Sequence, residues 1–195
     1  MDLKTTLDIV GTVLGLVYLW LEYRANIWLW LVGVVMPVVN AWLYYNRGIY
    51  ADFGMQIYYI GAGVYGWLMW RRGDRHRSAG DTTQGIRHAS ARELAVMMLA
   101  LAICWGAIYM FLSRLTDSRV PVLDSFTTAT SIVAMWALAR KYVEQWLLWL
   151  AVDAVCVWLY FYKHIPFHAL LYGFYTIMAV VGYLRWHRVS KSVHM

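Results

Sequence analysis

Long apolar runs separated by short polar gaps make up most of this 195-residue chain. A helix needs about 20 apolar residues to cross the ~30 Å hydrocarbon core of a bilayer. Seven runs reach or approach that length, at residues 5–23, 27–46, 50–70, 92–112, 120–139, 144–162 and 166–186. The pattern therefore predicts seven transmembrane helices.

The longest polar stretch, residues 71–91, lies between the third and fourth runs and has no apolar periodicity. We expect a flexible connector there. Three other gaps between apolar runs are short, at residues 46–48, 140–141 and 163–166, and we expect tight turns there. The chain opens with Met-Asp-Leu-Lys and lacks a small-residue cleavage site, so we expect no cleavable signal peptide.

The composition agrees with a protein that spans a membrane several times. Apolar residues make up 62% of the chain and charged residues 14%, against roughly 45–50% and about 25% in an average soluble domain. Two cysteines are too few for a disulfide scaffold or for a structural zinc site with the usual cysteine ligands. We predict an all-α integral membrane protein that has the lipid bilayer as its surroundings.

The positive charges predict the orientation. A nucleic-acid-binding protein gathers Lys and Arg on one soluble face, whereas here they lie in the gaps between apolar runs, so no nucleic-acid partner is expected. With the connector in the cytoplasm, twelve of the 17 Lys and Arg residues lie inside and five outside. We therefore expect a bacterial cytoplasmic (inner) membrane protein with its N-terminus outside and its C-terminus inside.

The chain also matches itself when it is shifted by 116 residues without a gap. A shared membrane composition would give scattered Leu and Val matches, but it would rarely align several tryptophans. The aligned pairs include Trp20 with Trp136, Trp30 with Trp146, Trp42 with Trp158, Trp70 with Trp186 and Gly66 with Gly182. The sequence therefore predicts a duplicated three-helix unit.

A fourth helix between two three-helix units returns the second unit to the orientation of the first. The predicted fold is thus seven transmembrane helices arranged as 3+1+3 parallel repeats. Its three parts are residues 1–72, residues 73–119 with the connector and linking helix, and residues 120–195 with a short cytoplasmic tail. Transporters with parallel repeats bind substrate near the membrane midplane between the two halves.

Four of the predicted helices carry aromatic, amide and small residues at spacings of three and four, and hence on one face. We expect these faces to line a pathway along the repeat axis. They hold Trp30, Gly33, Pro37, Asn40 and Tyr44; Gln56, Tyr59, Gly63 and Gly66; Trp146, Trp149, Asp153, Cys156 and Tyr160; and Tyr172, Tyr175, Ala179 and Gly182.

Asp153 is the single ionisable side chain that the pattern places deep within a span. A carboxylate there costs at least ~2.5–3.5 kcal/mol, so it needs a partner. It is either a structural residue bonded to Tyr or Trp groups, or an acceptor or counter-charge for a polar or cationic ligand. Trp146 and Trp149 favour the second interpretation, because Trp faces attract cations by ~0.5–2 kcal/mol.

Other candidates carry weaker signals. Gln56 and Asn40 either line the pathway or hold neighbouring helices together. The tryptophans at helix ends, Trp28, Trp70 and Trp186, fit an interfacial belt.

The sequence contains no Gly-rich phosphate loop and no Ser-His-Asp or Cys-His set at one membrane depth. His164 and His168 lack a third ligand, and residues 166–186 contain no Lys for a retinal Schiff base. We expect no enzyme activity, no cofactor and no bound metal.

Two segments resemble the PnuC vitamin transporters. The first repeat of that family ends in a run similar to residues 42–70, WLYYNRGIYADFGMQIYYIGAGVYGWLMW, and its sixth helix is similar to residues 140–163, RKYVEQWLLWLAVDAVCVWLYFYK. The resemblance covers nearly the whole chain outside 71–91. It implies a bundle with the topology of the SWEET sugar transporters, and facilitated diffusion of an unphosphorylated vitamin that a cytosolic kinase then traps.

The resemblance also implies substrate-binding residues, which fall on Gln56, Tyr59, Trp146, Trp149 and Asp153. Relatives that carry nicotinamide riboside tend to have Asn where this chain has Asp153. Thiamine is carried by other relatives, and both vitamins contain a positively charged aromatic ring. Asp153 suits either ring and tilts the expectation toward thiamine.

Our main hypothesis is a uniporter for such a cationic vitamin. The sequence is compatible with a monomer or a homo-oligomer. Trp146 and Trp149 would stack on the ring and Asp153 would balance its charge. Hydrogen bonds would come from Gln56, Tyr59 and Asn40, with Tyr175 on the facing stripe. The alternative is a membrane-embedded ligand sensor or scaffold that binds without transporting.

Overall fold

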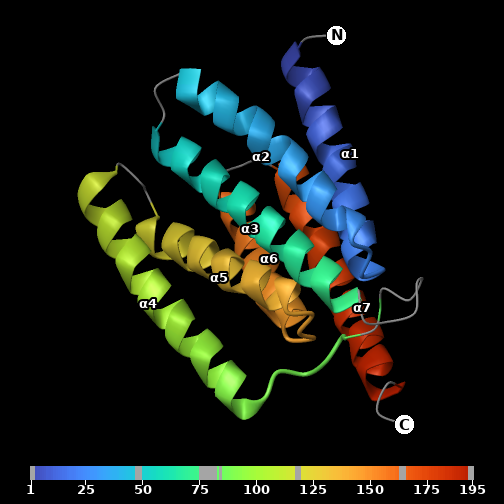
Figure 1. Cartoon of the computed structure of the whole chain (residues 1–195). Coiled ribbons are helices and arrows are strands. Elements are labelled where there is room, and N and C mark those ends of the chain that lie inside the picture. Colours follow the sequence, from blue (N-terminus) through green and yellow to red (C-terminus); the bar gives the residue numbers. More distant parts are fainter. Residues whose placement is uncertain are drawn as a thin grey trace. The chain divides into compact units, whose positions relative to one another are not determined.

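The computed structural model describes residues 3–46, 50–74, 83, 85–116, 120–162 and 166–192, and these residues are almost entirely helical. The helices are α1 (Leu3–Tyr23), α2 (Trp28–Asn46), α3 (Tyr50–Asp74), α4 (Ala91–Leu115), α5 (Pro121–Ala139), α6 (Gln145–Tyr162) and α7 (Pro166–Ser192) (Figure 1). Within the described residues, five segments are long and apolar enough to cross a membrane, in α2, α4, α5, α6 and α7. The prediction of an all-α membrane protein with seven helices is confirmed.

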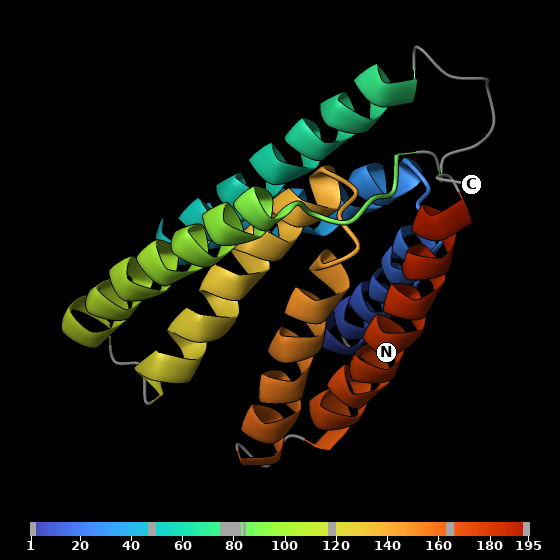
Figure 2. The same ribbon diagram turned by 90° about the horizontal axis from the view of Figure 1, so that it is seen from below.

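The chain forms two compact units, Met1–Gly85 and Ile86–Met195. In the first unit, α2 packs against both α1 and α3. In the second, α4 packs against α5, α5 against α6, and α6 against α7. Figure 2 shows α6 and α7 side by side and running in opposite directions. The expected division of the chain at residues 72 and 119 stays a prediction.

The turns after α1 and α5 have the same backbone conformation. Ala25 and Lys141 both take a left-handed conformation, with φ of 52° and 55°. The next residues, Asn26 and Tyr142, donate their backbone N–H to the carbonyl five residues earlier, at 2.8 and 3.0 Å. This pattern is a Schellman motif, which satisfies carbonyls that a helix end leaves free. The two turns are offset by the repeat length, so the backbone supports the duplication.

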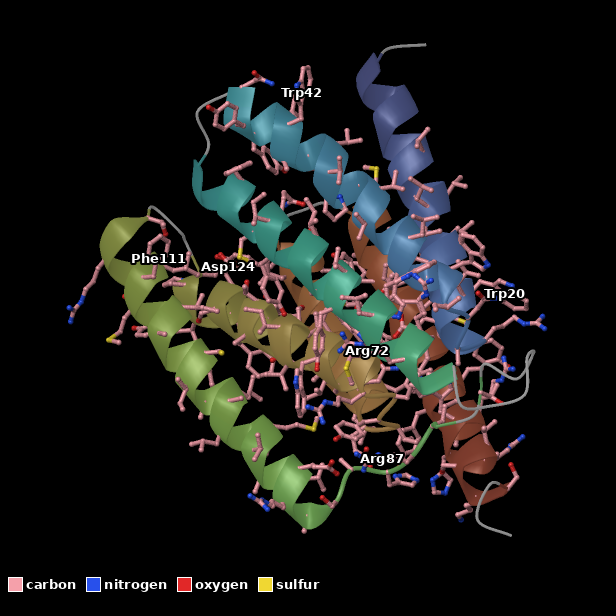
Figure 3. The ribbon with its side chains drawn as sticks, viewed as in Figure 1. Trp20, Trp42, Arg72, Arg87, Phe111 and Asp124 are labelled. Atoms are coloured by element: carbon pink, nitrogen blue, oxygen red, sulfur yellow. The ribbon has the colours of Figure 1, made fainter. Side chains whose placement is uncertain are left out.

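An arginine covers a tryptophan ring just before each of these turns. The guanidinium of Arg24 lies 5.5 Å from the ring centre of Trp20, and that of Arg140 lies 5.0 Å from the ring centre of Trp136. Figure 3 labels Trp20 on α1, where its side chain is exposed. These pairs are also related by the shift of 116 residues.

In the first unit, a tryptophan of α2 packs on a glycine of α3. The ring of Trp30 occupies the space that a Cβ on Gly66 would need. Trp70 lies one helical turn beyond Gly66, and its ring meets that of Trp30 edge to face, with centres 5.6 Å apart. The absence of a side chain on Gly66 thus lets α2 and α3 approach closely.

The second unit repeats this packing between α6 and α7. A Cβ on Gly182 would lie 2.6 Å from the ring of Trp146. Trp186 meets Trp146 edge to face, with ring centres 5.7 Å apart.

The expectation that Trp70 and Trp186 belong to an interfacial belt is wrong. Their side chains are only 2% and 0% exposed, because each follows its glycine by one turn and so faces the neighbouring helix. Trp28, by contrast, is exposed at the start of α2.

The expectation of a flexible connector over 71–91 is also wrong for its described ends. Helix α3 continues to Asp74. At the other end, Arg87 pairs with the turn between α5 and α6: its N–H donates to the carbonyl of Lys141 at 3.1 Å, and its carbonyl accepts from Val143 at 3.0 Å. Figure 3 shows Arg87 on the segment that leads into α4.

Side chains reinforce this attachment, which we term the connector clamp (Arg87, Ser90, Glu93 and Tyr142). Arg87 donates two hydrogen bonds to Glu93, at 3.0 and 2.7 Å, and Tyr142 donates a third to the same carboxylate at 2.5 Å. Ser90 and Glu93 form a capping box at the start of α4. Burial, together with the bond to Glu93, raises the pKa of the Tyr142 hydroxyl.

A second set of contacts lies beside the clamp. Glu144 accepts a hydrogen bond from the backbone N–H of Ala89 at 2.9 Å and lies 2.7 Å from Nδ1 of His88. Nε2 of His88 lies 2.9 Å from Nδ1 of His187 on α7. The end of the connector is therefore bonded to three elements of the second unit.

We predict that Gly66→Ala and Gly182→Ala each lower the free energy of unfolding by about 1–3 kcal/mol, because a new methyl group must displace a buried tryptophan ring. Thermal unfolding in detergent measures the change. Gly106→Ala and Gly173→Ala are matched controls, since a Cβ at either site meets nothing within 4 Å. We expect the controls to be neutral or stabilising by up to about 1 kcal/mol. An equal loss in all four variants would contradict the packing described.

We predict that Glu93→Ala releases the connector, because it removes the acceptor shared by Arg87, Ser90 and Tyr142. Limited proteolysis should then cut the 71–91 segment faster, and the unfolding temperature should fall. Arg92→Ala is the control: the neighbouring side chain is exposed and has no bond within the clamp. An unchanged cleavage rate in Glu93→Ala would contradict this prediction and show that the backbone pairing of Arg87 alone holds the connector in place.

Candidate functional site

The candidate site in the second unit is built on α6 and α7. Trp149 and Asp153 lie one turn apart on α6, and Tyr175 lies on α7, which packs directly against α6. The structure thus brings together three of the residues that the sequence predicted for a binding site.

Asp153 is buried, with 7% of its surface exposed. It forms no hydrogen bond or ion pair with another residue that the structure describes. Tyr172 and Tyr175 of α7 lie within electrostatic reach of its carboxylate. A buried carboxylate without bonded partners is costly, so the surroundings of Asp153 suit a ligand that supplies a positive charge or hydrogen-bond donors.

Three tyrosines form a cluster on α6 and α7, and two of them, Tyr172 and Tyr175, lie within electrostatic reach of Asp153. Tyr160 and Tyr172 stack with ring centres 5.2 Å apart, and Tyr172 meets Tyr175 edge to face at 5.7 Å. Tyr160 and Tyr172 belonged to the predicted stripes but had no assigned role. The cluster of Asp153 with these tyrosines offers aromatic faces and hydroxyl groups beside one carboxylate.

The two tryptophans of the predicted site differ in their surroundings. The ring of Trp146 is 1% exposed, because Gly182 and Trp186 cover it. Stacking of Trp146 on a ligand stays a prediction, and it would require the ring to be uncovered. Trp149 is partly exposed, but its Nε1 is buried and has no hydrogen-bond partner among the described residues. Trp149 can therefore offer both ring surface and a donor.

The other predicted residues lie in the first unit. Asn40 is on α2, and Gln56 and Tyr59 are on α3, which packs against α2. All three are partly buried. That they share one site with Trp149 and Asp153 stays a prediction.

Metal-ligating side chains do not gather anywhere in the described ranges, since no group of three or more His, Cys, Asp or Glu residues there could hold a metal ion. His164 lies outside the described residues.

Apolar helices long enough to span a membrane, in two units that share one packing pattern, with a buried carboxylate beside aromatic rings, are typical of membrane transporters. A family model described as "Nicotinamide mononucleotide transporter" matches residues 5–188. The chain belongs to this family, that of the PnuC vitamin transporters, as the sequence resemblance implied. It is therefore a membrane transporter of a vitamin-transporting family and not an enzyme.

Individual relatives extend the comparison. The chain is 32% identical over 185 residues to the riboflavin/roseoflavin transporter RibM of Streptomyces davaonensis, covering 94% of this chain and 85% of that one. It is 25% identical over 207 residues to the nicotinamide riboside transporter PnuC of Escherichia coli K12, with coverages of 95% and 87%. The crystal structure of the vitamin B3 transporter PnuC matches with a TM-score of 0.71 and 25% identity, over 94% of this chain and 81% of that one.

We predict that Asp153→Asn raises the unfolding temperature of the ligand-free protein in alkaline buffer, because it removes a buried charge. Ligand binding should weaken about five- to tenfold, since a hydrogen bond to a charged group is roughly 1–1.4 kcal/mol stronger than one to a neutral group. Thermal unfolding and calorimetric titration measure the two effects.

Asp124→Asn is the comparison variant, because Asp124 lies in the first turn of α5 and interacts with Tyr160 of the cluster, not with Asp153. Loss of its favourable interaction with the helix dipole should reduce stability by about 0.3–1 kcal/mol, and binding should weaken less than in Asp153→Asn. If Asp153→Asn destabilised the ligand-free protein and bound ligand normally, Asp153 would be a structural residue.

Proposed function

We propose that this protein carries an unphosphorylated vitamin across the bacterial cytoplasmic membrane by facilitated diffusion, and that riboflavin is its substrate. The observation behind the proposal is the buried carboxylate of Asp153 beside Trp149 and the tyrosine cluster of α6 and α7. The 32% identity to a riboflavin/roseoflavin transporter supports the choice of vitamin.

Riboflavin has a flat heterocycle and a hydroxylated chain, and both match the chemistry of the site. Trp149 and the tyrosines offer faces for the ring, while Asp153 accepts hydrogen bonds from the chain hydroxyls. Tyr175 completes the proposed site on α7, and Trp146 would join it only with its ring uncovered from Gly182 and Trp186. Asn40, Gln56 and Tyr59 of the first unit are further substrate-binding residues that we propose from the sequence.

Nicotinamide riboside is the second candidate, because the PnuC of Escherichia coli that matches 95% of this chain is named for it. It shares a ring and hydroxyls with riboflavin, but its pyridinium ring is positively charged. Thiamine also carries a charged ring. For either vitamin, Asp153 would act as a counter-charge, as the sequence first suggested.

Net uptake in this mechanism comes from a cytosolic vitamin kinase. Phosphorylation adds a charge of about −1.5 to −2 at neutral pH. The phosphorylated vitamin then fits poorly beside the carboxylate of Asp153 and cannot leave by the same path. The charge pattern of the connector favours an N-terminus outside and a C-terminus inside, which puts residues 71–91 on the side of the kinase.

We predict that riboflavin binds the purified protein in a calorimetric titration and that its phosphate binds at least about a hundredfold more weakly, a difference of ~2.7 kcal/mol. Nicotinamide riboside, thiamine and their phosphates are titrated separately in the same way. Tight binding of one of these two and not of riboflavin would reassign the substrate. Failure of all three vitamins to bind a folded sample would overturn the proposal.

Uptake into proteoliposomes separates a transporter from the alternative of a sensor or scaffold, which binds without flux. The vitamin should equilibrate across the vesicle membrane without ATP or an ion gradient. Vesicles that enclose the matching vitamin kinase with ATP should accumulate label beyond equilibrium, and vesicles that enclose the kinase without ATP are the control.

A further inference from the structure

Helix α6 differs from its repeat partner α2 along one stripe. At three positions, each one helical turn after the last, α6 has residues with hydrogen-bonding groups where α2 has residues with none in the side chain. These positions are Gln145, Trp149 and Asp153 in α6 against Leu29, Gly33 and Pro37 in α2.

The tryptophan packing next to this stripe is the same in both units. Trp30 and Trp146 follow the first position by one residue, and each lies on a glycine of the next helix. Each also meets a second tryptophan edge to face. The chemistry of the stripe therefore differs between two helices that keep the same tryptophan–glycine contact. At Gly33 of α2, a Cβ would lie 2.8 Å from the ring of Tyr18 of α1.

Gln145 is the residue on this stripe that the sequence analysis did not single out. It is the first residue of α6, and its side chain is 0% exposed. Neither its Oε1 nor its Nε2 has a hydrogen-bond partner among the described residues. Burying an amide without a hydrogen-bond partner lowers the free energy of unfolding by about 1–3 kcal/mol. Leu29, which is buried at the equivalent position of α2, carries no such penalty.

The neighbouring polar side chains of the turn do have partners. Tyr142 donates to Glu93, and Glu144 accepts from Ala89. Tyr142 and Glu144 thus have partners on α4 and the connector, whereas the amide of Gln145 has none among the described residues.

We propose that Gln145 is a further substrate-binding residue, whose amide pairs with an edge of the vitamin's heterocycle that presents a donor beside an acceptor. This inference rests on the proposed function. An amide offers one N–H donor and one oxygen acceptor side by side, so it matches the imide edge of a flavin or the carboxamide of a nicotinamide with two hydrogen bonds.

The length of the stripe fits this arrangement. Asp153 lies eight positions after Gln145, which corresponds to about 12 Å along the helix at 1.5 Å per residue. The heterocycle lies at Gln145 and against Trp149, whose free Nε1 adds a donor. The hydroxylated chain then extends toward Asp153 and the tyrosine cluster.

The test compares Gln145→Leu, which installs the residue of the first repeat, with the unmodified protein. Riboflavin should bind about 10–100-fold more weakly to the variant, because the ring edge loses its partner. The unfolding temperature of the ligand-free variant should stay the same or rise. Gln145→Met, which has a side chain of similar length, is the second variant if Gln145→Leu does not fold.

An analogue separates recognition from packing. Riboflavin methylated at the imide nitrogen lacks the donor of that edge, so the unmodified protein should prefer riboflavin to the analogue and Gln145→Leu should bind both alike. If nicotinamide riboside is the bound vitamin, nicotinic acid riboside replaces the analogue. A preference of the same size in both proteins would show that Gln145 does not read the ring edge, and would overturn the inference. Failure of the unmodified protein to bind any of the three vitamins would instead overturn the proposed function.

Discussion

The packing of a tryptophan ring on a glycine is the contact on which the rest of each unit depends. Trp30 on Gly66 and Trp146 on Gly182 bring consecutive helices closer than any larger side chain would allow. Within a membrane, apolar surface gains little from contact with another helix rather than with lipid, so close packing must hold the helices together. The same contact fixes the rotation of α6 and thereby the direction of its polar stripe.

The duplication separates the residues that build the unit from those that serve the substrate. Both units repeat the left-handed turn residue, the arginine over a tryptophan and the tryptophan on a glycine. They differ at the position that Pro37 occupies in the first unit and Asp153 in the second. A buried polar group without a hydrogen-bond partner lowers the stability of the fold. A protein that retains such groups without bonded partners sacrifices stability at that place, and a binding site is the ordinary reason for doing so.

The connector shows how far a local pattern can mislead. Its polar composition predicts a flexible segment, and nothing within it signals a partner. Arg87 becomes ordered because the turn between α5 and α6, more than 50 residues later, offers two backbone bonds and a tyrosine hydroxyl. Contacts of this range depend on the fold, so the sequence of the connector alone could not reveal them.

The sequence by itself determined the seven helices, their duplication and the family, since membrane spans require long apolar runs and the repeats keep the same tryptophans and glycines. It also singled out Asp153, because one acidic residue in a long apolar run is conspicuous. Only the tertiary structure decided which tryptophans are buried, and that the amide of Gln145 lacks a partner. Burial and hydrogen bonding depend on which neighbours a helix face meets, and those neighbours come from distant parts of the chain.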